Sequence, residues 1–269
     1  MTRIIAIASG KGGVGKTVLT ANLGTALAQR GKKVIMVDVD LDMANLELIL
    51  GMQGRPITLQ DVLNGEARIE DAIYDTPGGA KFVPAGVPAR QFKRVDPEKL
   101  ASVIAELGAY GDILLLDVPA GIGRDTIACF AAAKEVLILA TPEITSATDA
   151  YKTKLLAEKM GAETIGLVIN FWRKEKPGMT PESIASLLGL EDKILAKIPY
   201  DDEFRRISQK GKTVILEKPD NPVIKAIREL ASVLLGGQTA MSTTAAQTTK
   251  IKKPGLFSKL FSKFKKKRK

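Results

Sequence analysis

Cysteine is nearly absent from this sequence of 269 residues, and the single thiol, Cys129, cannot form an internal disulfide. It also cannot supply a four-cysteine metal or iron–sulfur site within one chain, or the paired ligands of a cluster that bridges a dimer. A single cysteine fits a reducing compartment, so we expect a cytoplasmic protein. Cys129 lies in the small-residue stretch "DTIACFAAAKE", which favours buried packing over chemistry.

Long hydrophobic runs are absent as well. No stretch reaches the roughly 18 consecutive apolar residues of a membrane-spanning helix. The apolar run in the N-terminal "MTRIIAIASG" is only as long as a strand and leads into a glycine-rich loop, so we do not expect a signal peptide. Because 45% of the residues are apolar, the chain can bury a sizeable core, and we expect a folded soluble protein.

Acidic residues are absent from the last twenty positions. Residues 250–269 contain ten Lys or Arg, which equals the whole net charge of +10 and leaves 30 cations against 30 acids in residues 1–249. Because the body of the chain is neutral, we expect no specific nucleic acid partner for it. The excess positive charge belongs to the tail.

Short β-branched runs alternate with helical patterns along most of the chain. Helical spacing marks "KTVLTANLGTALAQRG", which Gly31 ends, and "DPEKLASVIAELG", in which Asp96 is the expected N-cap, Pro97 is in the first turn and Gly108 ends the helix. The alternation predicts one doubly wound α/β domain with a mostly parallel sheet over residues 1–236. Six runs that are apolar on both faces are the expected strands: "RIIAIA", "KVIMVDVD", "DILLLDVP", "EVLILA", "TIGLVIN" and "KILAKIP".

Two further segments follow the expected domain. Residues 237–254 are small and polar without apolar periodicity, which predicts a flexible tether. Residues 255–269, "GLFSKLFSKFKKKRK", predict an amphipathic helix with a basic end, which is typical of an anchor lying in the plane of an anionic membrane surface. A disordered solubilising tail or a basic run that binds nucleic acid are the alternatives. Five residues form the apolar face of the expected helix: Leu256, Phe257, Leu260, Phe261 and Phe264.

The stretch "SGKGGVGKT" matches the P-loop pattern, in which Gly10 and Gly15 precede Lys16 and Thr17 between a strand and a helix. Glycines let backbone N–H groups turn toward a phosphate, and the start of the helix adds its positive dipole end. Lys16 is expected to reach the β- and γ-phosphates, and the Thr17 hydroxyl to ligate Mg²⁺. The loop also carries a second lysine, Lys11, that this pattern does not require.

Acidic side chains end two of the expected strands. "VIMVDVDLD" places Asp38, Asp40 and Asp42 at the carboxyl end of one strand, where ligands bind in such sheets. "DILLLDVPAG" ends another strand with Asp117, which suits a Walker B aspartate that holds Mg²⁺ through water. Each acid alone could be a helix cap or a loop charge, and Asp42 is the one best explained as structural.

The segments "KGGVGKT", "DVDLDMANLELILG" and "DVPAG" together resemble the deviant Walker A ATPases, the family that includes MinD, ParA, the nitrogenase iron protein and FlhG. Nearly the whole domain is similar, and the MinD group of archaeal type is the most similar. The resemblance implies a homodimer that forms on ATP and Mg²⁺, in which Lys11 reaches the partner's phosphates. A cation delivered in trans stabilises the charge of phosphoryl transfer. We expect slow, dimer-dependent turnover, because no residue resembles a strong general base.

The resemblance also implies roles for single residues. Lys11, Lys16 and Asp40 would be catalytic, Asp40 by positioning the attacking water. The metal shell would consist of Thr17, Asp38 and Asp117. The nucleotide would contact a larger set: Gly10, Lys11, Gly12, Gly13, Val14, Gly15, Lys16, Thr17, Val18, Asn170, Pro199 and Asp201.

Some of these positions lie outside the loop. Asn170 is expected to read the adenine edge, since an amide both donates and accepts hydrogen bonds, although it could also be an ordinary residue of a strand end. Pro199 and Asp201 would close the base and ribose pocket, and Asn45 and Asp149 would lie near the dimer interface.

The chain departs from the family at Val18, where Thr or Ser is usual. A hydroxyl contact to phosphate is lost there, whereas the backbone N–H remains.

Loop and tail together predict a membrane switch that acts in spatial positioning such as division-site placement. ATP would form the dimer, two tails would hold it on the inner face of the cell membrane, and hydrolysis would release both. A protein activator or cargo of unknown identity is a further expected partner. A DNA-partitioning ATPase of the ParA type and a regulator of the FlhG type are the alternatives, although FlhG proteins usually carry an extension before the first strand, which begins here at Arg3. A non-catalytic binding module would remain if Asp40 were misplaced.

Overall fold

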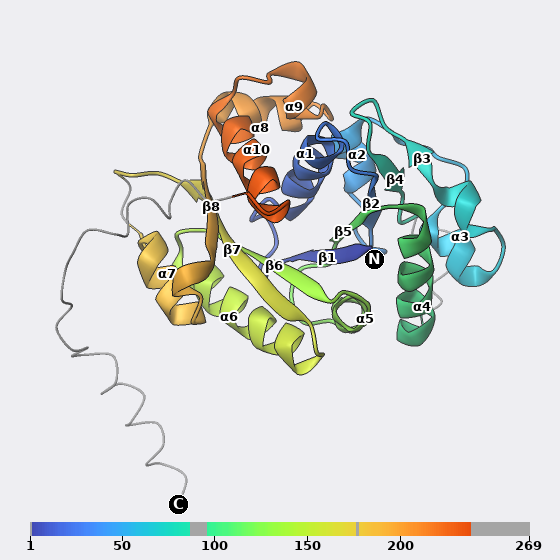
Figure 1. The fold of residues 1–269 in the computed structure, drawn as a ribbon, viewed down its shortest axis with the longest axis horizontal. Coiled ribbons are helices and arrows are strands. Elements are labelled where there is room, and N and C mark those ends of the chain that lie inside the picture. Colours follow the sequence, from blue (N-terminus) through green and yellow to red (C-terminus); the bar gives the residue numbers. More distant parts are fainter. Residues whose placement is uncertain (1, 87–95, 176–177, 238–269) are drawn as a thin grey trace, which may run out of the picture. The chain divides into compact units, whose positions relative to one another are not determined.

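In the part of the chain that this computed structural model describes, residues 2–86, 96–175 and 178–237, eight strands form one sheet. Their order is β3-β4-β2-β5-β1-β6-β7-β8 (Figure 1), and all neighbours pair in parallel except β3 with β4. The predicted doubly wound, mostly parallel sheet is therefore confirmed. The strands are β1 (Arg3–Ala8), β2 (Val34–Asp38), β3 (Tyr74–Asp75), β4 (Lys81–Val83), β5 (Ile113–Asp117), β6 (Glu135–Ala140), β7 (Glu163–Trp172) and β8 (Ile194–Pro199).

The six strands expected from the sequence correspond to β1, β2, β5, β6, β7 and β8. The pair β3 and β4 was not predicted, and it adds one parallel strand and one antiparallel edge beside β2. A tight turn joins the two, in which Thr76 N and Thr76 Oγ1 both donate to the carbonyl of Ala80, at 2.9 and 2.7 Å. The sheet therefore ends in a short hairpin at this edge.

Helices cover both faces of the sheet. Figure 1 shows α1, α8, α9 and α10 on one side and α5 and α6 on the other. The first group and α2 pack on one core cluster, whereas α3 to α7 pack on the second. The helices are α1 (Lys16–Ala28), α2 (Leu46–Leu50), α3 (Leu59–Asn64), α4 (Pro97–Leu107), α5 (Arg124–Ala132), α6 (Ile144–Lys159), α7 (Pro181–Leu188), α8 (Asp202–Ser208), α9 (Val214–Glu217) and α10 (Pro222–Leu234), with short 3₁₀ turns η1 (Ile69–Ala72), η3 (Gly108–Tyr110) and η4 (Glu191–Lys193).

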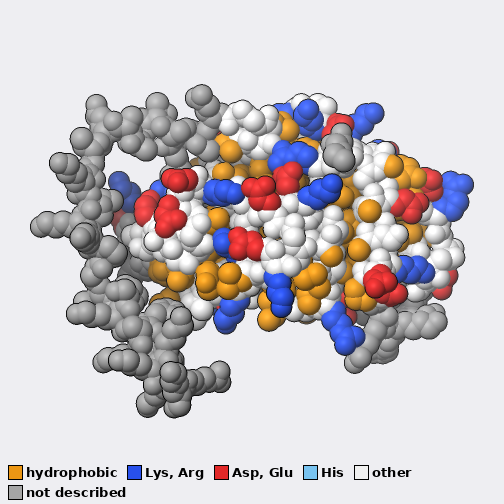
Figure 2. Space-filling view, turned by 60° about the horizontal axis from the view of Figure 1, so that its bottom comes forward, with side chains coloured by type: hydrophobic (Ala, Val, Ile, Leu, Met, Phe, Trp, Pro, Cys, Tyr) orange, Lys and Arg blue, Asp and Glu red, His pale blue; other side chains and the backbone are white. Residues whose placement is uncertain are grey.

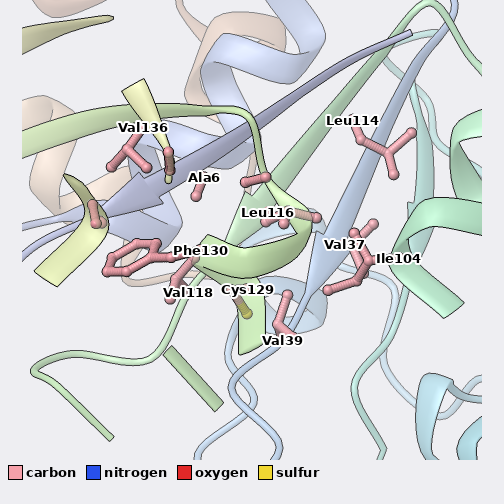
Figure 3. Packing of buried hydrophobic residues seen from close by; sticks show 14 of the residues in the cluster. Ala6, Val37, Val39, Ile104, Leu114, Leu116, Val118, Cys129, Phe130 and Val136 are labelled. Atoms are coloured by element: carbon pink, nitrogen blue, oxygen red, sulfur yellow. The ribbon is translucent and has the colours of Figure 1, made fainter. Parts of the chain in front are cut away.

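The central strand shows how the two core clusters arise. In β1, Ile5 and Ile7 point to the α1 and α10 side, whereas Ala6 and Ala8 point to the α4 and α5 side, because successive side chains of a strand alternate between faces. Figure 3 shows the second side, where α5 packs among side chains of the strands. The Cys129 side chain is fully buried there, so its predicted packing role is confirmed.

The helix α4 begins and ends as its sequence predicts. Asp96 is the N-cap and accepts from Glu98 N at 3.0 Å, and Pro97 occupies the first helical position. The helix ends at Leu107, and Gly108 begins the 3₁₀ turn η3. Pro at the first turn costs no hydrogen bond because that N–H has no partner within the helix.

The strand order places the functional loops. The chain leaves β1 for β2 on one side and later returns to β6 on the other side, so β1 lies at the point where the order of the strands reverses. In open α/β sheets, ligands bind beyond the carboxyl ends of the strands at this switch point. The P-loop follows β1, and the acidic segments follow β5, which pairs with β1, and β2, which pairs with β5.

The predicted C-terminal segment cannot be located in this fold. Residues 238–269, which include Leu256, Phe257, Leu260, Phe261 and Phe264, lie outside the described residues. Among the helices of the described ranges, none has both the length and the apolar character needed to cross a bilayer.

Candidate functional site

The P-loop needs glycine at two positions for steric reasons. A Cβ on Gly10 would lie 2.2 Å from the backbone carbon of Asp149 in α6. Gly15 has φ 94°, which side chains rarely adopt, and a Cβ there would lie 2.5 Å from Nδ2 of Asn170. The loop therefore packs tightly on α6 and β7 and still presents the start of α1 to a ligand.

Lys16, the first residue of α1, is the buried lysine of the loop. Only 9% of it is exposed, and burial lowers its pKa while the nearby charges of Asp117 and Asp40 oppose that shift. Asp117 accepts a hydrogen bond from the Thr17 side chain, and Thr20 Oγ1 lies 3.5 Å from Asp117 Oδ1. The ammonium, the hydroxyl and the carboxylate thus converge at the start of α1, as a P-loop requires.

Asp38 and Asp117 lie side by side at the carboxyl ends of β2 and β5, where they are register partners. Both are buried, at 1% and 3% exposure. Burial raises the pKa of Asp117 to about 6, against the lowering effects of the Thr17 hydrogen bond and the Lys16 charge. Burial, with the charge of Asp117, also raises the pKa of Asp38. Two adjacent buried carboxylates are stabilised by a nearby cation.

The oxygen atoms at this position fit Mg²⁺. Thr17, Asp38 and Asp117 supply hard oxygen atoms, and Mg²⁺ in phosphate sites uses one or two such side chains together with waters and the phosphates. Within the described part of the chain, no group of three or more His, Cys, Asp or Glu side chains forms a complete metal cage. The site therefore suits a metal that arrives with a phosphate ligand.

Asp38 also organises the loop that follows β2. Its Oδ1 accepts from Asp40 N at 3.1 Å, and its Oδ2 accepts from the N–H groups of Asn45 and Leu46 at 3.1 and 3.0 Å. Asp40 is half-buried and accepts from Met43 N at 3.0 Å. The loop from residue 40 to α2 is therefore built around the Asp38 carboxylate. Asp42 is exposed and does not line the cavity described below.

Lys11 is placed differently from Lys16. Its side chain is 47% exposed and its Nζ lies 3.1 Å from Oε2 of Glu143, the residue before α6, which is itself 62% exposed. Lys11 does not line the cavity described below. The two lysines of the loop therefore have different surroundings, and Glu143 is a partner of Lys11 that the sequence did not reveal.

A cavity of about 500 Å³ extends from the P-loop to α8 and α10. Its volume is that of ordinary small-molecule and cofactor sites. Its lining includes most of the expected nucleotide contacts that lie beyond Gly12: Gly13, Gly15, Lys16, Thr17, Val18, Asn170, Pro199 and Asp201. Asn45, expected at the dimer interface, also lines it, whereas Gly10, Gly12 and Val14 do not.

Two of the expected nucleotide contacts already have protein partners. Asn170 Nδ2 donates to the Val14 carbonyl at 2.8 Å, so the amide also fastens the P-loop to the end of β7. Asp201 is the N-cap of α8, and its Oδ1 accepts from Phe204 N at 2.6 Å and from Asn221 Nδ2 at 3.0 Å. Asp201 thus has a capping role that the sequence analysis did not consider.

An aromatic pair on the cavity wall was also missed. Phe171 has φ 56°, the one positive value of a non-glycine residue among the described positions, and it lines the cavity with Tyr200. The two rings meet edge to face at 6.1 Å, and the Arg173 guanidinium lies 3.6 Å from the centre of the Tyr200 ring. A left-handed Phe is rare, and no sequence pattern marks it.

Comparison with known proteins identifies the family. Residues 5–214 match the CbiA family, whose model describes the CobQ/CobB/MinD/ParA nucleotide binding domain. The chain belongs to this family. The resemblance stated from the P-loop and the acidic segments is therefore confirmed.

Proteins from several organisms are similar to this chain. An uncharacterized ATP-binding protein of Methanocaldococcus jannaschii is 41% identical over 238 residues, which are 88% of this chain and 89% of that protein. The antiactivator FleN of Pseudomonas aeruginosa is 33% identical over 240 residues, 85% of each chain. The solved structure of the septum site-determining protein MinD of Pyrococcus horikoshii, complexed with Mg-ADP, is 38% identical with a TM-score of 0.82, and the similarity covers 88% of this chain and 98% of that chain.

Proposed function

We propose that this chain is a MinD-like ATPase that dimerises on ATP, binds the membrane through its C-terminal segment and is released when ATP is hydrolysed. It acts in spatial positioning, such as placement of the division site. The observation that carries this proposal is the separation of the two P-loop lysines. Lys16 is buried beside Asp117, whereas Lys11 is half exposed and turned to Glu143.

In this proposal, ATP occupies the cavity of about 500 Å³, and Mg²⁺ is held by Thr17, Asp38 and Asp117. The backbone of Gly13 to Thr17 binds the phosphates, because N–H groups at the start of α1 face the same end of the cavity. Mg²⁺ supplies charge neutralisation at the phosphates. The solved MinD relative with Mg-ADP supports both cofactors.

Asp40 is proposed to position the attacking water. It lies two residues beyond Asp38, is half-buried, and its charge acts on Lys16. A carboxylate held by the Met43 N–H keeps oxygen lone pairs that can orient a water molecule. With no stronger base in the role, turnover stays slow and depends on the cation that Lys11 brings from the partner.

The dimer face is proposed to be the end of the sheet that carries the P-loop. Three large apolar side chains are exposed in the segments that follow β2, β5 and β6: Met43 at 71%, Ile122 at 60% and Ile144 at 68%. The carboxyl ends of parallel strands meet at one edge of a sheet, so these side chains surround the P-loop. A second copy would cover them and receive Lys11.

Membrane binding is proposed from the sequence of residues 255–269. One short helix buries only about five apolar side chains, so a monomer binds weakly and reversibly. Two such segments joined by an ATP-held dimer gain avidity of about 10² or more without a new contact. ATP therefore controls membrane binding through the number of tails in the assembly.

Flotation with anionic liposomes tests this proposal. The variants are the full chain, a chain that ends at residue 249, and a full chain in which Phe257, Phe261 and Phe264 are all Ser, each with ATP and with ADP. We expect only the full chain with ATP to float with the vesicles in quantity. Equal flotation in all six samples would show that neither nucleotide nor the apolar face controls binding.

Partitioning of DNA, as by ParA proteins, and regulation, as by the antiactivator FleN, are the alternative functions. Lys and Arg side chains on the face drawn in Figure 2 are interspersed with Asp and Glu, which does not favour nonspecific binding of DNA by the described residues of that face. A salt-sensitive gel shift by residues 1–249 would favour the ParA-type function instead.

A further inference from the structure

The end of β7 breaks the alternation of side chains along the strand. Val168 belongs to the core cluster on the α1 and α10 side of the sheet, and Ile169 belongs to the cluster on the other side. Asn170 then lines the cavity, which lies on the α1 and α10 side. A regular strand would turn the next side chain, that of Phe171, to the opposite face, yet Phe171 lines the same cavity as Asn170.

A bulge and a left-handed residue produce this arrangement. β7 pairs with β8 at Ile169 with Lys197 and again at Trp172 with Pro199, so two residues of β7 lie opposite one residue of β8. Bulges of this kind are common beside active sites, where they redirect a side chain. Phe171 lies in the bulge with φ 56°, a conformation that is unfavourable for a bulky side chain and persists mainly at ligand sites. The strained backbone therefore holds an aromatic ring at the cavity wall.

The Phe171 ring is accessible and lies beside the P-loop. Phe171 is 36% exposed, and a Cβ on Gly15 would lie 3.5 Å from Cζ of its ring. Tyr200 meets the ring edge to face, and the Arg173 guanidinium in turn packs on the Tyr200 ring, which stabilises this part of the wall. The ring is therefore a surface that a ligand in the cavity can touch.

The neighbouring amide indicates which part of a nucleotide lies beside this ring. Asn170 Nδ2 donates to the Val14 carbonyl, and among the described residues none donates a hydrogen bond to Asn170 Oδ1. This oxygen is not one of the enclosed side-chain atoms that lack a partner, so a ligand can reach it. Phosphates offer it no donor, whereas the amino group of a base does. A base held there lies within reach of the adjacent Phe171 ring, and every base has an aromatic face.

We propose that Phe171 is a specificity-determining residue whose ring packs on the face of the purine base of the bound nucleotide. The inference rests on the proposed function, because it takes ATP or ADP as the ligand of this cavity. A purine has two fused rings and covers more of an aromatic side chain than a single pyrimidine ring does. The consequence is that the site prefers adenine nucleotides over cytosine nucleotides.

Calorimetric titration of the full chain with ADP and with CDP, each with Mg²⁺, tests the inference. Cytosine also carries an exocyclic amino group, but it has one ring where adenine has two, so the comparison reports contact with the face of the base. Phe171→Gly removes the side-chain ring, and glycine adopts a positive φ without strain. We expect this variant to bind ADP about 5- to 100-fold more weakly and to lower the ratio of the CDP to the ADP dissociation constant by at least about 3-fold. Phe171→Tyr, which keeps the ring, should retain the wild-type ratio.

Leu187→Ala is the matched control. Leu187 in α7 is an apolar side chain with a similar exposure of 39% that does not line the cavity, so its removal should leave both dissociation constants unchanged. A ring that only supports the P-loop beside Gly15 would give a different result. Phe171→Gly would then weaken ADP and CDP binding equally and keep the ratio, which would overturn the inference. Phe171→Asn, whose side chain also tolerates a positive φ, serves if the glycine variant is unstable.

The outcomes separate the two proposals. Absence of ADP binding by the wild type would overturn the proposed function and this inference with it. Binding of ADP and CDP by the wild type with equal dissociation constants would overturn the role of Phe171 alone.

Discussion

Replacing Lys11 by Ala is the sharpest test of the proposed dimer. Among the described residues of one subunit, the Lys11 ammonium forms an ion pair with Glu143 at 3.1 Å, and the two side chains are 47% and 62% exposed. An exposed pair of this kind contributes about 0.2–1 kcal/mol to stability, and salt screens it. The variant should therefore fold and unfold nearly as the wild type does.

Its effect on turnover should be far larger. A cation delivered in trans to a transferring phosphoryl group is worth about 10³–10⁵ in kcat where an arginine supplies it. We expect Lys11→Ala to reduce ATP turnover by at least about 10² and to remain monomeric with ATP, while its ADP affinity stays within a few-fold of wild type. Phosphate release and light scattering measure the first two quantities.

Two controls isolate the cause. Glu143→Gln breaks the same pair but keeps the lysine, so it should retain turnover. Lys212→Ala removes an exposed lysine that is paired with Glu217 at the same 3.1 Å, and it should have no effect. The reasoning is refuted if Lys11→Ala pairs and hydrolyses ATP like the wild type, or if Glu143→Gln loses turnover to the same extent.

Three further predictions concern the site and the core. Asp40→Asn keeps an acceptor for the Met43 N–H and should bind ATP normally, but its kcat in a phosphate-release assay should fall by about 10² or more. Unchanged turnover would contradict the proposed role of Asp40 in positioning the attacking water. Gly10→Ala should lower the free energy of unfolding, measured in urea, by about 1–3 kcal/mol, because its Cβ would overlap the backbone of Asp149. Gly12→Ala is the control and should be close to neutral, because a Cβ at that position has nothing within 4 Å. Equal stability of the two variants would contradict the packing described for the loop. Burial raises the pKa of the Cys129 thiol well above its usual range, so a thiol reagent at pH 8 should label this residue only when the chain unfolds. Rapid labelling of the native chain would contradict the burial of Cys129 in the core.

Much of the fold was predictable because the strands of a parallel sheet that is buried on both faces are short, nearly continuous apolar runs. The six runs identified in the sequence correspond to six strands. β3 and β4 were missed because they have only two and three residues and lie in polar surroundings, so neither length nor periodicity distinguishes them from a loop. The hairpin between them depends on the turn at Thr76, which is local chemistry rather than pattern.

Residue patterns alone predicted the P-loop and the acids at the strand ends, whereas Asn170, Pro199 and Asp201 were expected only from the family resemblance. The P-loop has a fixed spacing and a required strand and helix around it, so its steric demands follow from the sequence. Glu143 and Phe171 come from segments that the fold brings to the cavity and the loop, and no sequence pattern marks the ion pair of the first or the left-handed backbone of the second. The capping role of Asp201 could have been read from the acidic start of "DDEFRRIS", since Asp is a common N-cap.

Asp38 connects the proposed metal site to the segment between β2 and α2. Its two carboxylate oxygens accept hydrogen bonds from the backbone N–H groups of Asp40, Asn45 and Leu46, so any movement of this carboxylate would pull on the segment that leads from β2 into α2. The same segment carries the carboxylate of Asp40 and the protruding side chain of Met43. If Asp38 holds Mg²⁺ as proposed, arrival or departure of the cation would shift this segment, and a neighbouring molecule in contact with Met43 would respond to the cation without touching it.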